Sequence, residues 1–286
     1  IHRPPVLTSE SINAIAGAQC FFKCENFQKM GAFKMRGATN AILQLNETEK
    51  AKGVVTHSSG NFAQAVALSA KLLGIKASII IPTNAPSVKK NAVRGYGADI
   101  IDCEPTNRSR EVTTSNFMKF TGSIFLHPFD QIEVVVGNST VAQEFFSQTG
   151  PLDYIIAPVG GGGLIAGTSL ATHYFSKETI VIGAEPLNAD DAYHSLKEGR
   201  VIPVQNPQTI ADGLRTSLGE ATFPIIKQFV KEIIRVEEEE IVQSMQLIWE
   251  RMKIVIEPSS AVALAALIQQ KKRFQNSRTG IILSGG

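Results

Sequence analysis

Short apolar runs alternate with longer segments of helical spacing along most of the chain. The runs are rich in Val and Ile, which favour strands, and polar or glycine-containing loops separate them from the helical segments. The predicted strands are 19–23, 53–57, 77–81, 99–103, 123–127, 152–159, 179–184 and 280–283, and the predicted helices are 10–16, 38–45, 62–73, 87–95, 107–121, 141–148, 164–174, 237–251 and 261–267. Strands that alternate with amphipathic helices indicate parallel sheets covered by helices, so the sequence predicts an α/β protein.

Individual residues mark the starts and the buried faces of some helices. Thr8 or Ser9 is a favoured cap for the helix 10–16. The four glutamates 237–240 suit the first turn of a helix, because negative charge there complements the helix dipole. Trp249 is expected to anchor that helix in the core.

Length and charge limit the classes of protein. A chain of 286 residues can form one large domain or two small ones with a substantial core. Its 28 basic and 26 acidic residues leave a formal charge of +2, so neither nucleic acid nor a membrane surface is an expected partner. No apolar run has the length of a membrane span, and no signal peptide is visible. The chain starts at Ile1 and stops directly after a predicted strand, so both ends are expected to be trimmed.

The cysteines indicate a reducing compartment. Cys20, Cys24 and Cys103 are an odd and sparse set, which does not suit a disulfide framework. No histidine or further cysteine near Cys20 and Cys24 completes a zinc site, so these two are expected in the core. A cytoplasmic location is predicted.

Lys34 is the first candidate for a catalytic residue. It stands between Phe33 and Met35, and Gly31 and Gly37 favour a tight backbone around it. Burial would favour the neutral, nucleophilic amine. A solvated lysine at the start of a helix is the simpler interpretation, and these residues alone leave both open.

Two loops between a strand and a helix have the composition of anion sites. Ser58-Ser59-Gly60-Asn61 precedes the helix 62–73, where an ordinary helix cap and an anion site are equally good interpretations. Gly160, Gly161, Gly162 and Gly163 precede the helix 164–174. Four consecutive residues without Cβ let backbone amides approach a ligand, and the helix dipole favours a phosphate, so a phosphate site is the favoured interpretation of this second loop. A third candidate site is acidic. The segment Glu185-Pro186-Leu187-Asn188-Ala189-Asp190-Asp191 could bind a hard cation, although spacing alone favours a solvated acidic turn.

A phosphate site, a lysine for an aldehyde and a hydroxyl for a ring atom together fit pyridoxal 5′-phosphate (PLP), an electron sink for the α-carbon of amino acids. The motifs that carry a resemblance are 27–38 (Phe-Gln-Lys-Met-Gly-Ala-Phe-Lys-Met-Arg-Gly-Ala), 58–61, 160–163, 210–213 (Ile-Ala-Asp-Gly) and 283–286 (Leu-Ser-Gly-Gly). In this order they resemble the fold type II PLP-dependent enzymes over nearly the whole chain, and most of all the serine racemases and the threonine or serine dehydratases.

The resemblance implies a role for each matching residue. Lys34 would form a Schiff base with PLP and act as the base on one face, and Ser59 would be the acid or base on the other face. Asn61 would contact the ring hydroxyl, Gly160–Gly163 the phosphate and Ser284 the pyridine nitrogen. Ser58, Ser59, Asn61 and Arg110 would contact the substrate. Glu185, the carbonyl of Ala189 and Asp191 would bind a divalent cation (Mg²⁺, Mn²⁺ or Ca²⁺), against the interpretation that spacing alone favours.

The implied fold has two parallel-type α/β domains with the active site in the cleft. The large PLP-binding domain would comprise 1–52 and 131–286, and the small inserted domain 53–130. The implied activity is racemisation of serine together with dehydration of L-serine or L-threonine, through a Lys34/Ser59 two-base site, in a homodimer. The alternative is a threonine or 3-hydroxyaspartate dehydratase without significant racemase activity.

The sequence departs from the family pattern in three places. Phe62 stands where His is usual, Phe129 stands where a polar residue is common, and Gly137-Asn138-Ser139-Thr140 replaces Gly-Gln-Gly-Thr. These departures leave the substrate open among serine, threonine and 3-hydroxyaspartate. A β-replacement enzyme of the same fold is disfavoured by Ser59, by the cation-site residues and by 212–213, and a non-catalytic binder is disfavoured by Lys34.

Overall fold

The chain forms two compact units. The structure, a computed structural model, describes residues 1–286 apart from the side chain of Asn107. Unit 1 comprises Ile1 and Lys34–Gly137, and unit 2 comprises His2–Phe33 and Asn138–Gly286. The division after Gly137 falls inside helix α7 (Ile132–Thr149). The domain limits that the resemblance implies, at residues 53 and 131, stay a prediction.

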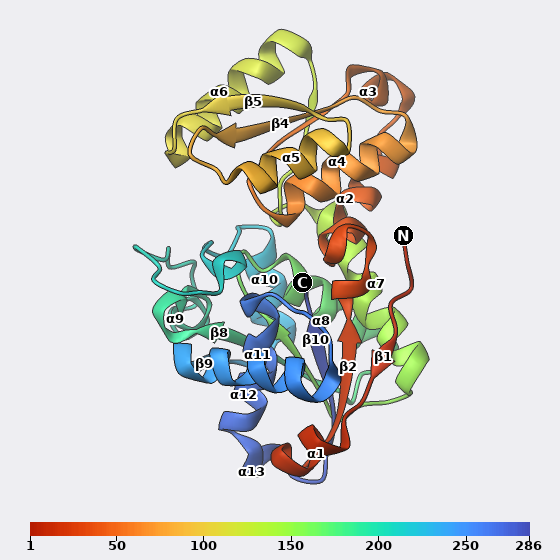
Figure 1. Cartoon of the computed structure of the whole chain (residues 1–286), viewed down its shortest axis with the longest axis vertical. Helices are drawn as coiled ribbons and strands as arrows, with labels where there is room; N and C mark the ends of the chain where they lie inside the picture. Colours follow the sequence, from red (N-terminus) through yellow and green to blue (C-terminus); the bar gives the residue numbers. More distant parts are fainter. The chain divides into compact units, whose positions relative to one another are not determined.

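Unit 2 is built on a six-stranded sheet with the order β1-β2-β10-β7-β8-β9 (Figure 1). Its strands are β1 (Val6–Leu7), β2 (Gln19–Cys24), β7 (Tyr154–Pro158), β8 (Ile180–Pro186), β9 (Glu232–Val236) and β10 (Arg278–Leu283). Only β1 pairs antiparallel with its neighbour, and Ile281 of β10 lies in register between Phe22 of β2 and Ile156 of β7. The parallel arrangement brings the carboxyl ends of β2, β10, β7 and β8 to one edge of the sheet.

Helices cover both faces of this sheet because neighbouring residues of a strand point to opposite sides. Ile281 belongs to the apolar cluster that includes α12 (Pro258–Gln269), whose residues 259–267 are all buried. A Cβ at the adjacent Gly280 would lie 2.8 Å from Phe145 of α7, so α7 covers the other face. The remaining helices of unit 2 are α1 (Glu10–Ala16), α8 (Gly163–Phe175), α9 (Asp191–Glu198), α10 (Thr222–Phe229), α11 (Glu238–Met252) and α13 (Lys271–Phe274).

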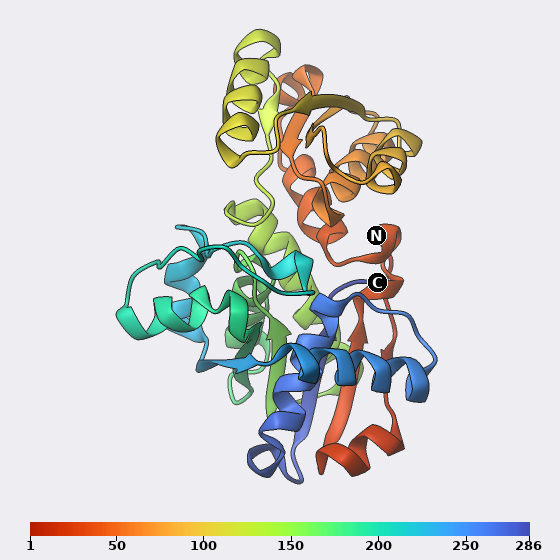
Figure 2. The ribbon, with the colours of Figure 1, turned by 60° about the vertical axis from the view of Figure 1, so that its left-hand side comes forward.

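Helix α11 packs on α12 (Figure 2), but not through the residue that the sequence predicted as its core anchor. Its buried residues Ile241, Ser244 and Ile248 follow helical spacing and face α12. Trp249 lies next to this stripe rather than in it, and 43% of its surface is exposed. Its prediction as the core anchor was wrong. The glutamates do form the first turn, where Glu237 and Glu240 make a capping box.

Unit 1 contains a four-stranded parallel sheet with the order β5-β4-β3-β6. Its strands are β3 (Val54–His57), β4 (Ala77–Pro82), β5 (Asp99–Cys103) and β6 (Ile124–Phe125), and its helices are α2 (Lys34–Leu43), α3 (Glu47–Lys52), α4 (Asn61–Leu73), α5 (Ser87–Gly95) and α6 (Asn107–Thr121). Helices α2 and α4 approach closely over small side chains, where the hydroxyls of Thr39 and Ser69 are 2.8 Å apart.

The two parallel sheets confirm the predicted α/β class. Ser9 caps α1 as predicted, and the buried Cys20 and Cys24 confirm their prediction as core residues. Two predicted helices were too short: α2 begins at Lys34 and α7 at Ile132. None of the helices in the described part of the chain is long and apolar enough to cross a membrane.

Candidate active site

Lys34 lies at the first residue of α2 with two aromatic rings around its amine. Its Nζ donates a hydrogen bond to the carbonyl oxygen of Pro128 at 2.7 Å. The ring centroids of Phe62 and Phe129 are 5.6 Å and 6.0 Å from Nζ, within the range of a cation–π contact. The side chain of Lys34 is half-buried, and that of Phe62 is only 2% exposed. The amine is therefore held at a fixed place beside apolar surface.

A ladder of rings continues from this amine along the carboxyl ends of β6 and β3. Phe129 meets His127 edge to face at 4.7 Å between centroids, and His57 stacks on Phe125 at 5.1 Å. Nδ1 of His127 accepts hydrogen bonds from the backbone N–H groups of Asp130 at 2.8 Å and Phe129 at 3.3 Å. Burial lowers the pKa of His127 to about 4, and the charge of Lys34 contributes to the lowering. His127 is thus neutral near pH 7, with its proton on Nε2.

The serine loop comprises Ser58, Ser59 and Gly60 and joins β3 to α4, which begins at Asn61. The backbone N–H of Gly60 donates to Oγ of Ser58 at 3.3 Å. Gly60 is the N-cap of α4 and has no side chain to accept from the first-turn amides, so a ligand can accept from them instead. Ser58, Ser59 and Asn61 are half-buried in this loop. The structure therefore gathers three predicted site residues at one helix terminus.

Arg110 lies in α6, close enough to His57 to affect it. Burial lowers the pKa of His57, and the positive charge of Arg110 adds to the lowering. Nε of Arg110 is buried and has no hydrogen-bond partner among the residues that the structure describes. A buried guanidinium nitrogen without a partner is costly, and an anion would satisfy it.

The glycine loop, Gly160–Gly163, follows β7 in unit 2 and leads into α8. Gly162 has a φ of +89°, and a Cβ there would lie 2.7 Å from Oγ1 of Thr222. A Cβ on Gly160 would lie 3.0 Å from the carbonyl oxygen of Gly213. A side chain would be strained at Gly162 and crowded at Gly160, and Gly162 caps α8 without a side chain. The amides of the first turn, which no side chain caps, suit a phosphate group.

Two serines that the sequence did not single out support this edge of the sheet. Oγ of Ser259 accepts from the backbone N–H of Gly213 at 3.1 Å and so holds the turn that packs on the glycine loop. Oγ of Ser260 lies 3.1 Å from Oγ of Ser284, accepts from the N–H of Gly285 at 2.8 Å and is 2.6 Å from the carbonyl oxygen of Gly285. Because Ser260 can give its one hydrogen to that carbonyl, Ser284 is then the donor in the contact between the two hydroxyls.

Glu185, at the carboxyl end of β8, and Asp191, at the start of α9, form a buried carboxyl pair. Glu185 is 1% exposed and accepts from the backbone N–H groups of Tyr193 at 2.7 Å and Ala192 at 3.2 Å. Asp191 is 4% exposed and accepts from the N–H of Leu218 at 2.9 Å. Burial raises the pKa of Asp191 to about 7. Burial also raises the pKa of Glu185 well above its usual value, and the negative charge of Asp191 raises the pKa of Glu185 further.

No three His, Cys, Asp or Glu side chains converge on a metal position in the part of the chain that the structure describes. The predicted cation site needs only two carboxylates and the carbonyl of Ala189, a residue buried to 1% exposure. These are oxygen donors, which hard divalent cations prefer. A cation would also offset the cost of burying two negative charges. The donor set therefore fits the predicted ion.

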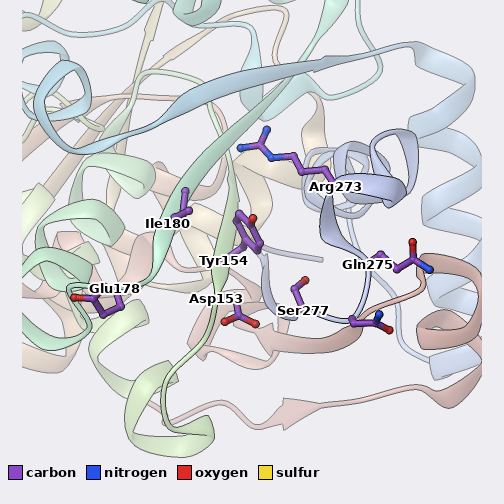
Figure 3. A pocket seen from close by; sticks show the side chains of 8 residues that line it. Asp153, Tyr154, Glu178, Ile180, Arg273, Gln275 and Ser277 are labelled. Carbon is purple, nitrogen blue, oxygen red and sulfur yellow. The ribbon is translucent and has the colours of Figure 1, made fainter.

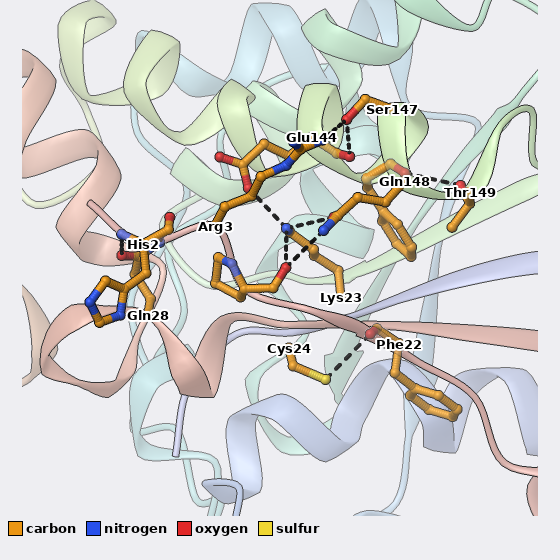
Figure 4. Close-up of polar contacts among 12 residues, drawn as sticks. His2, Arg3, Phe22, Lys23, Cys24, Gln28, Glu144, Ser147, Gln148 and Thr149 are labelled. Atoms are coloured by element: carbon orange, nitrogen blue, oxygen red, sulfur yellow. Dashed lines mark hydrogen bonds and ion pairs between the residues drawn. The ribbon is translucent and has the colours of Figure 1, made fainter.

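A buried lysine outside these sites had no signal in the sequence. Lys23 of β2 is 0% exposed, and its Nζ lies 2.9 Å from each of the carbonyl oxygen of Pro4, Oε2 of Glu144 and Oε1 of Gln148 (Figure 4). The ammonium has three hydrogens and three acceptors, so the buried charge is satisfied. Lys23 therefore has a structural role, fixing the amino-terminal segment and the carboxyl half of α7 on the sheet.

A pocket of about 400 Å³ lies elsewhere in unit 2 (Figure 3). Its lining residues are Asp153, Tyr154, Glu178, Ile180, Arg273, Gln275, Asn276 and Ser277. These residues stand at the amino ends of β7, β8 and β10, opposite the edge that carries Ser284 and the glycine loop. Ligand sites of open α/β sheets lie at the carboxyl ends of the strands, so we assign no ligand to this pocket.

Both units contain parallel strands, and the serine loop follows β3 whereas the glycine loop follows β7. Together with a lysine beside apolar surface, these loops are typical of one class of protein: α/β enzymes that bind a phosphorylated cofactor. The chain matches the family of pyridoxal-phosphate dependent enzymes over residues 1–285. It therefore belongs to this family. The match confirms the predicted fold type, the enzyme class and the dependence on PLP.

Three relatives illustrate the similarity. The β-hydroxyaspartate dehydratase of Paracoccus denitrificans is 47% identical over 100% of this chain and 91% of its own length. The crystal structure of serine racemase from Dictyostelium discoideum is 48% identical, with a TM-score of 0.96 over 100% of this chain and 92% of that one. The crystal structure of a threonine deaminase from T.th. is 41% identical, with a TM-score of 0.94 and the same coverage.

Proposed function

We propose that the protein is a PLP-dependent serine racemase that also dehydrates L-serine or L-threonine to a keto acid and ammonia. The observation that carries the proposal is the amine of Lys34, held by Pro128 at 2.7 Å beside two aromatic rings. Relatives with racemase and dehydratase names at 47–48% identity support the same pair of reactions. A dehydratase of threonine or 3-hydroxyaspartate is the second candidate, favoured by the dehydratase and deaminase names among them.

The residues that would hold PLP fit its parts. Lys34 would bind its aldehyde carbon, the amides of Gly160–Gly163 its phosphate, Asn61 its ring hydroxyl and Ser284 its pyridine nitrogen. PLP supplies an electron sink for negative charge at the α-carbon. A neutral hydroxyl at Ser284 can donate to the pyridine nitrogen but does not protonate it as an acid would, so the sink is moderate.

Two residues would move the α-proton. Lys34 would take it on one face of the substrate, and the hydroxyl of Ser59 would exchange it on the other. Delivery from the opposite face inverts the α-carbon, whereas loss of the β-hydroxyl from the same deprotonated substrate leads to the keto acid. The amides of the serine loop and the guanidinium of Arg110 would bind the α-carboxylate and exclude other orientations.

The cofactor link and the two-base assignment can be tested separately. Borohydride reduction followed by peptide mass spectrometry is expected to locate a pyridoxyl group on the peptide that contains Lys34, and Lys34→Ala is expected to lose it. Ser59→Ala is expected to abolish racemisation of L-serine while dehydration persists. A pyridoxyl group on another lysine, or an equal loss of both activities in Ser59→Ala, would contradict the respective assignment.

We propose that Glu185, Asp191 and the carbonyl of Ala189 bind a divalent cation such as Mg²⁺. The support is the burial of both carboxyl groups and the raised pKa of each. Mg²⁺ is expected to raise the melting temperature of the wild-type protein and to leave that of Asp191→Asn unchanged. An equal shift in both proteins would place the ion elsewhere.

We also propose a homodimer located in the cytoplasm. All three cysteines are buried free thiols, as suits a reducing compartment. Sedimentation equilibrium is expected to give twice the chain mass of 30.9 kDa, and a single-chain mass would contradict the dimer.

A further inference from the structure

Two phenylalanines, Phe62 and Phe129, converge on one atom. Phe62 comes from the first turn of α4 and Phe129 from the segment after β6, yet both rings lie within 6.0 Å of Nζ of Lys34. If Lys34 takes the α-proton, the α-carbon of the substrate must lie within hydrogen-bonding reach of this atom. The other groups attached to the α-carbon are then close to the aromatic rings.

These rings offer nothing to a second carboxylate. A phenyl ring has no hydrogen-bond donor, and its face carries negative electrostatic potential, which attracts ammonium groups and repels anions. The nearest imidazole brings no positive charge, because His127 accepts from two backbone N–H groups through Nδ1 and is neutral near pH 7. Arg110 supplies one guanidinium, which the proposed function already uses for the α-carboxylate.

We infer that Phe62 and Phe129 determine the substrate class: an amino acid with a small, uncharged β-hydroxy side chain, such as serine or threonine, in preference to one with a second carboxylate. The inference rests on the proposed function, since it assumes that Lys34 is the residue that takes the α-proton. The methylene and methyl groups of serine and threonine gain apolar contact with the rings, whereas a carboxylate would lose hydration beside ring faces that repel anions.

The test compares L-serine, L-threonine and 3-hydroxyaspartate as substrates for dehydration by the PLP-loaded enzyme. A hydrogen-bonding group that finds no partner in a site lowers kcat/KM strongly, so 3-hydroxyaspartate is expected at least about 100-fold below L-serine. Phe62→His and Phe129→Asn each add a donor beside Lys34 and are expected to change this ratio by about tenfold or more in favour of 3-hydroxyaspartate. Phe62→Leu is the matched control: it stays apolar, so the ratio is expected to stay with serine.

A binding measurement separates recognition from turnover. α-Methylserine and α-methylaspartate have no α-proton, so calorimetry measures their affinity without reaction, and the wild-type protein is expected to bind only α-methylserine tightly. Because Phe62 is a core residue, its variants can unfold; Phe129 is half-buried, so Phe129→Asn provides an independent test.

Wild-type kcat/KM for 3-hydroxyaspartate equal to or above that for L-serine would overturn the inference. The same holds for Phe62→His and Phe129→Asn variants that fold and keep the wild-type ratio. Failure of the proposed function has a different signature: no turnover of any of the three amino acids, or no pyridoxyl group on Lys34 after borohydride reduction. That result would refute the inference as well, because its basis would be gone.

Discussion

Replacing His127 by Asn should make unit 1 less sensitive to acid. Nδ1 of His127 accepts from the backbone N–H groups of Phe129 and Asp130. An imidazolium has no acceptor, so protonation would break both bonds and place a charge in a half-buried position. The Oδ1 atom of Asn can take the place of Nδ1, but an amide does not titrate between pH 4 and 8.

The expected loss of unfolding free energy at low pH follows from the pKa of His127, which burial lowers from 6.5 to about 4. Because the folded pKa is the lower one, the unfolded chain binds the proton more readily. The stability that neutral His127 contributes is therefore fully present above pH 6.5 and is lost as the pH falls towards 4. At pH 4.5 the loss amounts to roughly 2–3 kcal/mol at 1.4 kcal/mol per pH unit.

Urea unfolding followed by circular dichroism at pH 7.5 and pH 4.5 would measure this loss of unfolding free energy. The decrease in unfolding free energy between the two pH values should be roughly 2 kcal/mol smaller in His127→Asn than in the wild type, because all other titrating groups cancel. His127→Gln is the matched variant: it does not titrate either, but its amide reaches the Nε2 position, so it should lose stability at both pH values. Identical pH dependence in the wild type and His127→Asn would refute the assignment of this acid sensitivity to His127.

Two further substitutions test other parts of the fold. Lys23→Met removes the buried ammonium that pairs with Glu144 and should lower the unfolding free energy by about 3 kcal/mol. Lys50→Met removes one member of the exposed pair with Glu47 and should lower it by less than about 1 kcal/mol. Urea titration measures both losses, and equal losses would contradict the structural role of Lys23. Gly162→Ala places a Cβ 2.7 Å from Thr222 at a φ of +89° and should lower the PLP affinity measured by absorbance titration. Gly74→Ala is the control: its φ is +69° but the space around it is open, so it should lose only about 1 kcal/mol of stability and bind PLP normally. Normal PLP binding by Gly162→Ala would argue against the glycine loop as the phosphate site.

The glycine loop and the parallel sheets could be predicted because their signals are local. A run of four glycines between a strand and a helix, and strands that alternate with helices, are visible in consecutive residues. Trp249 was misplaced for the opposite reason: a large aromatic residue suggests the core, but the helical period of Ile241, Ser244 and Ile248 decides which face is buried.

The surroundings of Lys34 could not be predicted, because they depend on the register of a folded sheet. Pro128 and Phe129 come from a loop more than 90 residues away and reach Lys34 only because β6 pairs with β3. The role of Ser260 likewise depends on the contact between the start of α12 and the end of β10. Neither contact leaves a pattern in the local sequence.

Ser260 also bears on how the chain would tune its cofactor. Because Ser260 accepts from the N–H of Gly285 and can give its hydrogen to the carbonyl of the same residue, it fixes the backbone that carries Ser284. The Ser284 hydroxyl, which then donates to Ser260, would have to rotate to donate to a pyridine nitrogen. A pyridine nitrogen that accepts from a hydroxyl stays uncharged and withdraws electrons weakly from the α-carbon. With such a sink, proton removal would depend more on the placement of Lys34 and on the contacts that hold its amine.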